Sequence, residues 1–360
     1  VPAEVCPGAS SRTVTTRARR KICWKGVAFR TIPWVGGAVL GALFLWLVWT
    51  PRTVEVPVPV APTHQVSNTD PGPAPKVVLQ GESGTVWALA FVGPDKIVTG
   101  MDDGQVKIWD LKRRSVLKSL EPRQGGTVWS VDVSADGKYL VTTCDDSVVT
   151  EWNLDSYGVE NSFPQPTSTK AAVFSPNGEK IATGDRNSTI RVWDIRAQIP
   201  IPLNGHRGTV YSLAFSPDGN RLASAGADGT AKVWNLEELN PPMTLDQHKG
   251  PVYGVAFNPD GTRIATAGWD GTVRIWDSRG LLLQTIQAYE GDAWSVSFGG
   301  NGKWVATAGP DAVKVFEVDS GKEIFAYRGE RAFHVVRFAK DGKTLAAGGR
   351  DGIVRVWEIE

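Results

Sequence analysis

The stretch "SPDGNRLASAGADGTAKVWNL", residues 216–236, contains two short apolar runs, each preceded by an Asp-Gly pair. Asp-Gly between alternating apolar residues favours the tight turn of a β-hairpin. A near copy, "NPDGTRIATAGWDGTVRIWDS", begins 42 residues later and occupies residues 258–278. Recurrence at a period of about 40 residues indicates a repeat architecture, in which each copy buries its sheet against its neighbours.

An aromatic residue followed by a polar one closes each copy, at spacings of 43, 41, 41, 42, 40 and 41 residues. The seven pairs are Trp109-Asp110, Trp152-Asn153, Trp193-Asp194, Trp234-Asn235, Trp276-Asp277, Phe316-Glu317 and Trp357-Glu358. In this register the sequence resembles the WD40-repeat family over residues 76–360. The resemblance implies an all-β fold, a seven-bladed propeller with four-stranded blades.

The ends of the repeat region predict how the ring closes. The chain stops after the third strand of the last unit, whereas the apolar run "KVVLQ" at residues 76–80 belongs to no unit of its own. Pairing this run outside the last blade would cover an exposed sheet edge. We therefore expect residues 76–80 to complete the seventh blade.

The resemblance also implies a buried hydrogen-bonded chain of His, Ser or Thr, Asp and Trp within a blade. The fourth and fifth units match it fully, with His206, Ser224, Asp228 and Trp234, and with His248, Thr266, Asp270 and Trp276. Asn187 replaces the Asp in the third unit. In the sixth unit, Asp311 precedes Phe316 by five residues, whereas the Asp of the fully matching units precedes its Trp by six. Blades three and six are therefore expected to be the least regular.

Three segments precede the repeats: basic residues 1–30, an apolar segment at 31–50, and a proline-rich linker at 51–75. Residues 32–49 form an uncharged run that is long enough to span most of a bilayer core. We therefore expect a single transmembrane anchor. A buried soluble helix and a cleaved signal peptide are the alternatives. Basic residues before the span predict a cytoplasmic N-terminus. The layout resembles bacterial membrane WD40 proteins, so the propeller is expected outside the inner membrane, with the cytoplasmic side as the alternative.

Composition argues against several classes of function. With a net charge of only +1, the chain has no strong positive field that would attract nucleic acid. Its three cysteines do not have the spacing of metal ligands or of a disulfide framework. A His-Asp pair such as His206 and Asp228 is also found in catalytic triads, but its recurrence one period later favours a structural role. We expect no catalytic residues, no metal and no cofactor.

The start of each innermost strand is the candidate binding site. Counting four residues back from Phe91 and its counterparts gives Trp87, Trp129, Lys170, Tyr211, Tyr253, Trp294 and His334. By resemblance, these lie at the top rim of the central channel, and Asp102, Asp145, Arg186, Trp269 and Arg350 lie beside them. Trp, Tyr and Arg are frequent anchors of protein interfaces. The alternative is that these aromatic side chains pack inward as core.

Together these features favour a membrane-tethered, non-enzymatic scaffold that binds a protein or peptide partner on the top face. A propeller that senses a small solute at the channel mouth is the alternative, as is an accessory subunit of a membrane enzyme or receptor. The sequence does not specify the oligomeric state.

Overall fold

The computed structural model describes residues 71–80, 84–122, 126–238 and 240–360. The predicted basic segment, the predicted anchor at 31–50 and residues 51–70 of the linker lie outside the described residues. Within the described ranges, no helix is long and apolar enough to cross a membrane.

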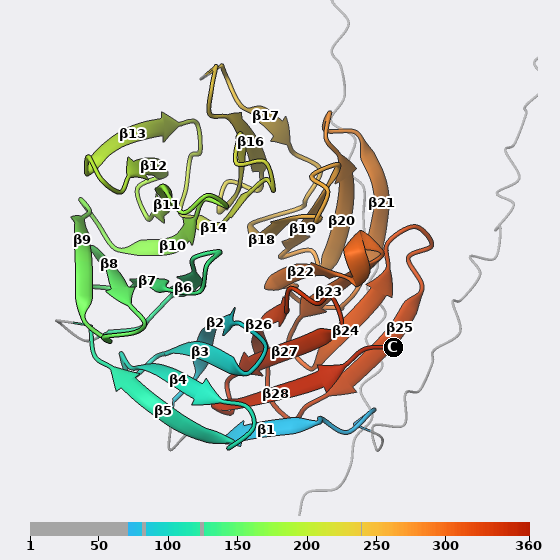
Figure 1. Cartoon of the computed structure of the whole chain (residues 1–360). Helices are drawn as coiled ribbons and strands as arrows, with labels where there is room; N and C mark the ends of the chain where they lie inside the picture. Colours follow the sequence, from blue (N-terminus) through green and yellow to red (C-terminus); the bar gives the residue numbers. More distant parts are fainter. Residues whose placement is uncertain (1–70, 81–83, 123–125, 239) are drawn as a thin grey trace, which may run out of the picture. The chain divides into compact units, whose positions relative to one another are not determined.

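Seven four-stranded antiparallel sheets surround a common centre, which is the predicted propeller (Figure 1). Blade one contains β2 (Val86–Val92), β3 (Lys96–Met101), β4 (Val106–Asp110) and β5 (Ser115–Leu120). Blade two contains β6 (Ser130–Val133), β7 (Tyr139–Thr143), β8 (Val148–Asn153) and β9 (Val159–Pro164). Blade three contains β10 (Thr169–Phe174), β11 (Lys180–Asp185), β12 (Thr189–Asp194) and β13 (Ile199–Asn204).

The later blades repeat this order. Blade four contains β14 (Val210–Phe215), β15 (Arg221–Gly226), β16 (Ala231–Asn235) and β17 (Met243–Leu245). Blade five contains β18 (Val252–Phe257), β19 (Arg263–Gly268), β20 (Thr272–Asp277) and β21 (Leu282–Gln287). Blade six contains β22 (Ser295–Gly299), a short 3₁₀ helix (Gly300–Gly302), β23 (Trp304–Ala308), β24 (Ala312–Glu317) and β25 (Glu323–Arg328). Blade seven contains β26 (Phe333–Phe338), β27 (Thr344–Gly349) and β28 (Ile353–Glu358), together with β1 (Val77–Gln80).

The first Asp-Gly pair of each quoted copy forms the turn between the first and second strands of its blade. Gly219 and Gly261 have φ angles of 76° and 72°, a left-handed conformation that favours glycine. In each turn the carboxylate before the glycine accepts a backbone hydrogen bond, as Asp218 does from Asn220 N at 3.0 Å. These local bonds set the register of β14 against β15 and of β18 against β19.

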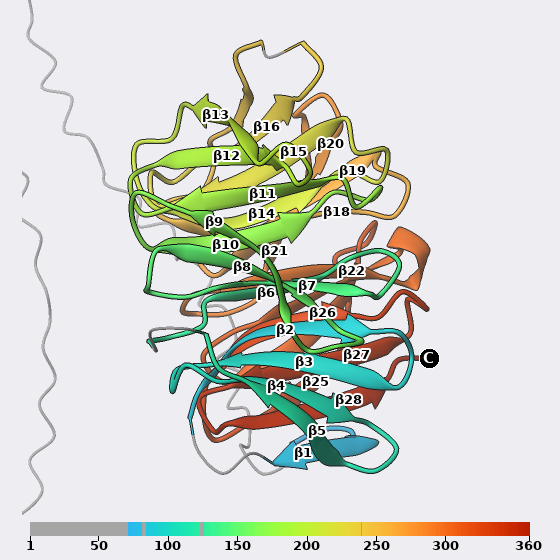
Figure 2. The same ribbon diagram turned by 60° about the vertical axis from the view of Figure 1, so that its left-hand side comes forward.

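The core consists of the seams between neighbouring blades, which pack face to face (Figure 2). At the seam between blades three and four, Ile190 and Leu203 pack with Leu222 and Trp234, each at most 6 % exposed. Each fully buried aliphatic side chain contributes about 1.5–3 kcal/mol, so the ring is held by apolar burial between blades.

Blade seven is built from the two ends of the repeat region. β1 pairs antiparallel with β28, with Val77 opposite Val356 and Gln80 opposite Ile353, as expected for residues 76–80 (Figure 1). Leu79 is fully buried. The outer edge of β28 is thereby paired with a strand from the opposite end of the repeat region.

The expectation that blade three would be irregular was wrong as regards its strands. All four strands are six residues long, and Gln165 takes the position of the missing His, with Thr183 Oγ1 3.4 Å from its side-chain oxygen. Asp185 and Arg191 form an ion pair at 2.7 Å in the region of the altered turn. A polar side chain of a different type therefore occupies the His position, and an ion pair lies near the altered turn.

Blade six has four strands but lacks the hydrogen-bonded chain. The side chain of Phe316 has no N–H group, and the buried hydroxyl of Thr307, on the neighbouring strand β23, has no hydrogen-bond partner. Tyr289 takes the position of the His, and its hydroxyl lies 2.9 Å from Thr307 O and 3.0 Å from Ala312 O.

Candidate functional site at the channel mouth

The seven side chains predicted at the channel rim surround one end of the central cavity. We refer to Trp87, Trp129, Lys170, Tyr211, Tyr253, Trp294 and His334 as the mouth ring, and to the end at which the inner strands begin as the top face. Trp87, Lys170, Tyr211, Tyr253 and His334 lie at register shifts in their inner strands, whereas Trp129 and Trp294 directly precede β6 and β22. A residue at a bulge departs from the regular alternation of side chains between the two faces of a sheet. The side chains of the five residues at register shifts are therefore directed toward the cavity.

All seven side chains of the mouth ring are partly buried. They therefore differ both from core residues, which are excluded from solvent, and from freely exposed surface residues. The two interpretations of the sequence, core or binding surface, each describe part of this environment.

An arc of four contacting aromatic rings, one pair of them stacked, forms one side of the mouth. His334 stacks on Trp87 with ring centroids 4.1 Å apart and an interplanar angle of 17°. Trp294 lies 4.9 Å from His334, and Trp129 lies 5.1 Å from Trp87. Tyr211 and Tyr253 form a separate pair at 5.3 Å. Such contacts contribute about 0.5–1.5 kcal/mol each beyond burial, so the rings hold one another in place.

Lys170 covers the end of the arc. Its Nζ lies 3.3 Å from the centroid of the Trp129 ring and 3.3 Å from Asp145 Oδ1. The same oxygen accepts hydrogen bonds from Trp129 Nε1 at 2.8 Å and from Ser168 Oγ at 3.0 Å. Burial lowers the pKa of Lys170 although Asp145 opposes the shift. The charges at this point of the ring are paired with each other.

Burial also keeps His334 uncharged. Desolvation, together with the positive charge of Arg350, lowers the pKa of His334 to about 4. The imidazole between Trp87 and Trp294 is therefore neutral at pH 7, which favours stacking without a buried charge.

The five residues predicted beside the ring form an exposed rim. They are Asp102, Asp145, Arg186, Trp269 and Arg350, and each is exposed. Trp269 is 55 % exposed, and it is the indole with the largest exposure given for the described residues. The rim thus combines both signs of charge with one large apolar side chain.

A cavity of about 500 Å³ lies below the mouth ring and is lined by residues of all seven inner strands. Three charged residues that we did not predict line it, Asp132, Arg337 and Lys340. Burial raises the pKa of Asp132 to about 6. Asp132 Oδ2 accepts a hydrogen bond from Phe174 N of the next blade at 2.8 Å, and Lys340 Nζ donates one to Ala135 O at 2.8 Å. Two of them could have been found by aligning the seven repeats. The residue directly before Phe91 and its counterparts is small or apolar in five repeats, and the exceptions are Asp132 and Arg337.

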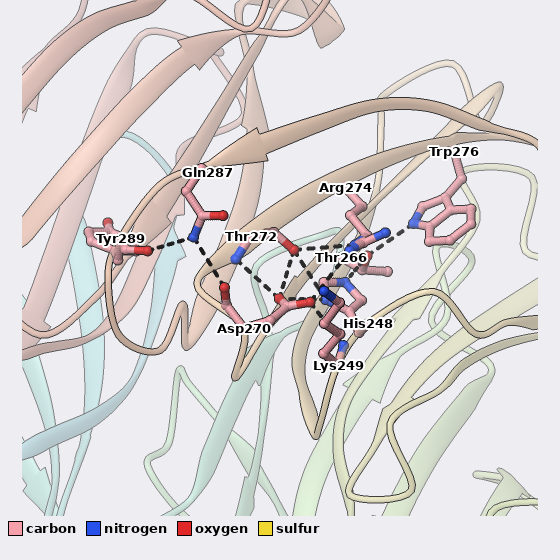
Figure 3. Close-up of polar contacts among 9 residues, drawn as sticks. All are labelled: His248, Lys249, Thr266, Asp270, Thr272, Arg274, Trp276, Gln287 and Tyr289. Atoms are coloured by element: carbon pink, nitrogen blue, oxygen red, sulfur yellow. Dashed lines mark hydrogen bonds and ion pairs between the residues drawn. The ribbon is translucent and has the colours of Figure 1, made fainter. Parts of the chain in front are cut away.

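The predicted network residues form two continuous hydrogen-bonded chains. In blade five, His248 lies 3.0 Å from Asp270 and 2.8 Å from Thr266, which accepts a hydrogen bond from Trp276 Nε1 at 3.0 Å (Figure 3). In blade four, the corresponding distances are 2.9 Å for His206–Asp228, 2.8 Å for His206–Ser224 and 2.9 Å for Trp234–Ser224.

These chains leave both nitrogens of each histidine occupied. The His206 and His248 side chains are fully buried, and burial lowers the pKa of both imidazoles against the effect of the partner carboxylates. Burial alone would raise the pKa of Asp270, but hydrogen bonds from Lys249 N, Thr272 and His248 lower it below its ordinary value. An imidazole held in this way has no nitrogen available for proton transfer to a substrate.

Neither a thiol nor a metal cluster adds chemistry within the described residues. Cys144 is buried, and burial raises the pKa of its thiol to about 12, which makes it unreactive. No group of three or more His, Cys, Asp or Glu side chains in the described ranges has the geometry of a metal site.

Comparison with protein families agrees with this architecture. The model of the WD domain, G-beta repeat matches residues 74–110, 114–153, 162–194, 198–235, 239–277 and 321–358, which is more than half of the chain. The chain belongs to the WD40 family. Residues 278–320, which contain β22, β23 and β24 of the Phe316 blade, lie outside the matched ranges of this WD40 protein.

Curated relatives of the WD40 chain are similar over part of their length. It is 28 % identical over 171 residues to nuclear distribution protein PAC1 of Arthroderma otae, covering 38 % of this chain and 36 % of that protein. It is 30 % identical over 144 residues to pre-mRNA-processing factor 19 of Oryza sativa subsp. japonica, covering 38 % and 27 %. It is 32 % identical over 109 residues to p21-activated protein kinase-interacting protein 1-like of Gallus gallus, covering 29 % and 28 %. The matches span about a third of each relative, and all three are eukaryotic proteins.

Proposed function

We propose that this WD40 protein is a membrane-tethered scaffold, without catalytic activity of its own, that binds a protein or peptide partner on the top face. The observation that carries the proposal is the partly buried mouth ring, in which aromatic rings are held in place yet remain accessible from the channel mouth. Rigid aromatic side chains supply large contact area at low cost in conformational entropy, which is typical of binding hot spots.

Unpaired polar groups support this assignment. Among the described residues, nothing accepts a hydrogen bond from Trp87 Nε1 or bonds to the hydroxyls of Tyr211 and Tyr253. The indole N–H groups of Trp129 and Trp294, in contrast, bond to Asp145 and Asp292. A partner that covers the mouth must therefore supply hydrogen-bond partners to Trp87 and the tyrosine pair, because a buried polar group left unpaired costs about 1–3 kcal/mol.

The exposed rim fits the periphery of such an interface. Trp269 offers an apolar anchor outside the ring, and Asp102, Arg186 and Arg350 offer charges that remain hydrated and contribute chiefly to specificity. One relative is named as a kinase-interacting protein. That name supports a protein partner in general but does not identify the partner of this chain.

Crosslinking followed by capture from membranes tests the proposal. The variant Trp87→Ala/Trp294→Ala removes two rings of the arc. The control Ile199→Ala/Leu281→Ala removes apolar side chains that are 65 % and 59 % exposed on the outer edges of blades three and five. We expect the first variant to lose a specific crosslinked partner at least tenfold and the control to retain it, with both showing the wild-type circular dichroism spectrum. Equal capture by both variants would contradict a partner site at the mouth.

We also propose that residues 31–50 anchor the chain in a bacterial inner membrane, with residues 1–30 in the cytoplasm and the propeller outside it. The support is the uncharged run at 32–49 and the excess of basic residues before it. Added protease should degrade the propeller in intact spheroplasts. Protection until the membrane is lysed would place the propeller in the cytoplasm instead.

The cavity favours one second candidate, the binding of a small solute below the mouth ring. Its volume of about 500 Å³ lies within the range of small-molecule sites. Tryptophan fluorescence during a ligand screen distinguishes the candidates, since a solute would change the emission of the wild type but not of Trp87→Ala/Trp294→Ala. If the captured partner is a membrane enzyme or receptor, the protein is its accessory subunit.

A further inference from the structure

Residues 71–80 form a strap across three consecutive blades. Pro71 O accepts a hydrogen bond from Arg328 N, at the end of the outer strand of blade six, at 2.8 Å. Lys76 N donates to Val356 O of blade seven at 2.8 Å, and Val77–Gln80 then forms β1. Leu79, on β1, packs among core residues of blade one. The last five residues of the predicted linker, 71–75, thus lie against the propeller rather than extending from it.

Trp357 holds the linker end of the strap. In blades one to five, the corresponding Trp donates its indole N–H to a Thr or Ser on the second strand, as Trp193 does to Thr183 at 3.3 Å. Blade seven has Ala347 at that position, so no hydroxyl is available. Trp357 Nε1 donates instead to Pro73 O at 3.1 Å. The Trp that stabilises its own blade elsewhere in the ring therefore binds the strap here.

Gly72 fits the strap against blade six. Its φ angle is +88°, and a Cβ at this position would lie 2.1 Å from Ala326 O, a backbone atom that cannot move aside easily. The backbone of residues 71–73 can therefore approach β25 only with glycine at position 72.

The strap covers the seam between blades seven and one. Leu79 packs there with Leu89, Ile97 and Trp109 of blade one and with Val354 of blade seven, and both Leu79 and Ile97 are fully buried. Gly348 of β27 is so close to Val86 of β2 that a Cβ would lie 2.7 Å from the Val86 side chain. The same seam carries the stacked pair of His334 from β26 and Trp87 from β2. One side of the mouth ring is therefore assembled across the joint that the strap closes.

We propose that the strap positions the mouth ring: by packing on blades six, seven and one, residues 71–80 hold the seam at which His334 stacks on Trp87. The state of the linker segment is thereby coupled to the geometry of the binding face. The consequence for partner binding rests on the proposed function, whereas the effect on the His334–Trp87 pair does not.

A matched pair of truncations separates this effect from a general loss of stability. Leu79 on β1 and Leu203 on β13 occupy equivalent places in outer strands, opposite Val354 and Ile190 in the third strands of their blades. Leu79→Ala weakens the seam between blades seven and one, and Leu203→Ala weakens the seam between blades three and four. Trp357→Phe and Trp193→Phe form a second pair, since each removes one indole N–H bond.

The readout is the pKa of each histidine in the full chain, followed by NMR of ¹³C/¹⁵N-histidine. The chain has four histidines, so assignment through His→Gln variants is simple. We expect Leu79→Ala and Trp357→Phe to move the pKa of His334 from about 4 toward its ordinary value of 6.5, because the imidazole gains access to water. Leu203→Ala and Trp193→Phe should leave it unchanged while lowering the melting temperature by a similar amount.

Two outcomes overturn the proposal: an unchanged pKa of His334 in both strap variants, or an equal shift in the strap and control variants. These measurements need no partner, so they remain decisive if the proposed function fails. If a partner is captured, Leu79→Ala should reduce its capture more than Leu203→Ala does. Equal capture by the two variants would mean that the strap does not influence partner binding.

Discussion

The imidazole of His334 lies 4.1 Å from the indole of Trp87, nearly parallel to it, and this contact joins the last blade of the ring to the first. The two side chains come from inner strands at opposite ends of the repeat region, β26 and β2. Their contact therefore exists only in a closed ring. Ring closure and the assembly of the mouth depend on the same seam.

The environment of His334 predicts a loss of stability in acid. Because the pKa of His334 is lowered from 6.5 to about 4, its contribution is fully present above pH 6.5 and is lost as the pH falls from 6.5 toward 4. His334→Phe keeps a ring in the stack but cannot bind a proton. Thermal melts between pH 7.5 and pH 4.5 should show a smaller decrease for His334→Phe than for the wild type. An identical decrease would mean that His334 titrates normally in the folded protein.

Asp132 predicts the opposite dependence. Its raised pKa, about 6, means that ionisation at neutral pH opposes folding, so stability falls as the pH rises from about 4 to 6. Asp132→Asn keeps an acceptor for Phe174 N but carries no charge. The variant should be more stable than the wild type at pH 8, by on the order of 1–2 kcal/mol, with the difference shrinking at pH 4. Urea denaturation at the two pH values measures this, and a less stable variant at pH 8 would contradict the burial of an unfavourable charge.

The orphaned hydroxyl in blade six predicts a stabilising substitution. Thr307 Oγ1 is buried without a partner, so Thr307→Val removes a desolvated polar group at nearly constant shape and should raise the free energy of unfolding by about 1 kcal/mol. Thr266→Val in blade five is the matched control, because Thr266 bonds to His248 and Trp276. Loss of the Thr266 hydroxyl leaves His248 Nε2 and Trp276 Nε1 buried without partners, and it should lower the free energy of unfolding by about 2–4 kcal/mol. Equal effects in urea denaturation would remove the distinction between the two blades.

The repeat architecture was predictable because its signals are local and recur. Asp218-Gly219 and its counterparts define hairpins, and seven aromatic-polar pairs at one spacing specify the number of blades. The free edge after the third strand of the last unit also indicated where residues 76–80 lie. The mouth ring followed from the alignment together with the family resemblance, since a single position per repeat places its side chain at the same height in the channel.

Other features depend on contacts between distant segments, for which the sequence contains little signal. The docking of Pro73 on Trp357 joins residues 284 positions apart and follows from a missing hydroxyl at Ala347. The regularity of blade three was missed because Gln165 and Arg191 take roles that the His-Ser-Asp-Trp pattern does not describe. Composition is a poor guide where different side chains satisfy the same hydrogen-bonding need.

Site-specific photocrosslinking tests the central claim, that partners bind at the mouth, most directly. A photoreactive amino acid replaces Trp269, 55 % exposed on the top rim, or Ile199, 65 % exposed on the outer edge of blade three. After irradiation of intact membranes, we predict a discrete crosslinked species from position 269 that is absent or at least tenfold weaker from position 199. A species formed from position 199 and not from position 269 would contradict the claim and place the partner on the outer edge of the ring.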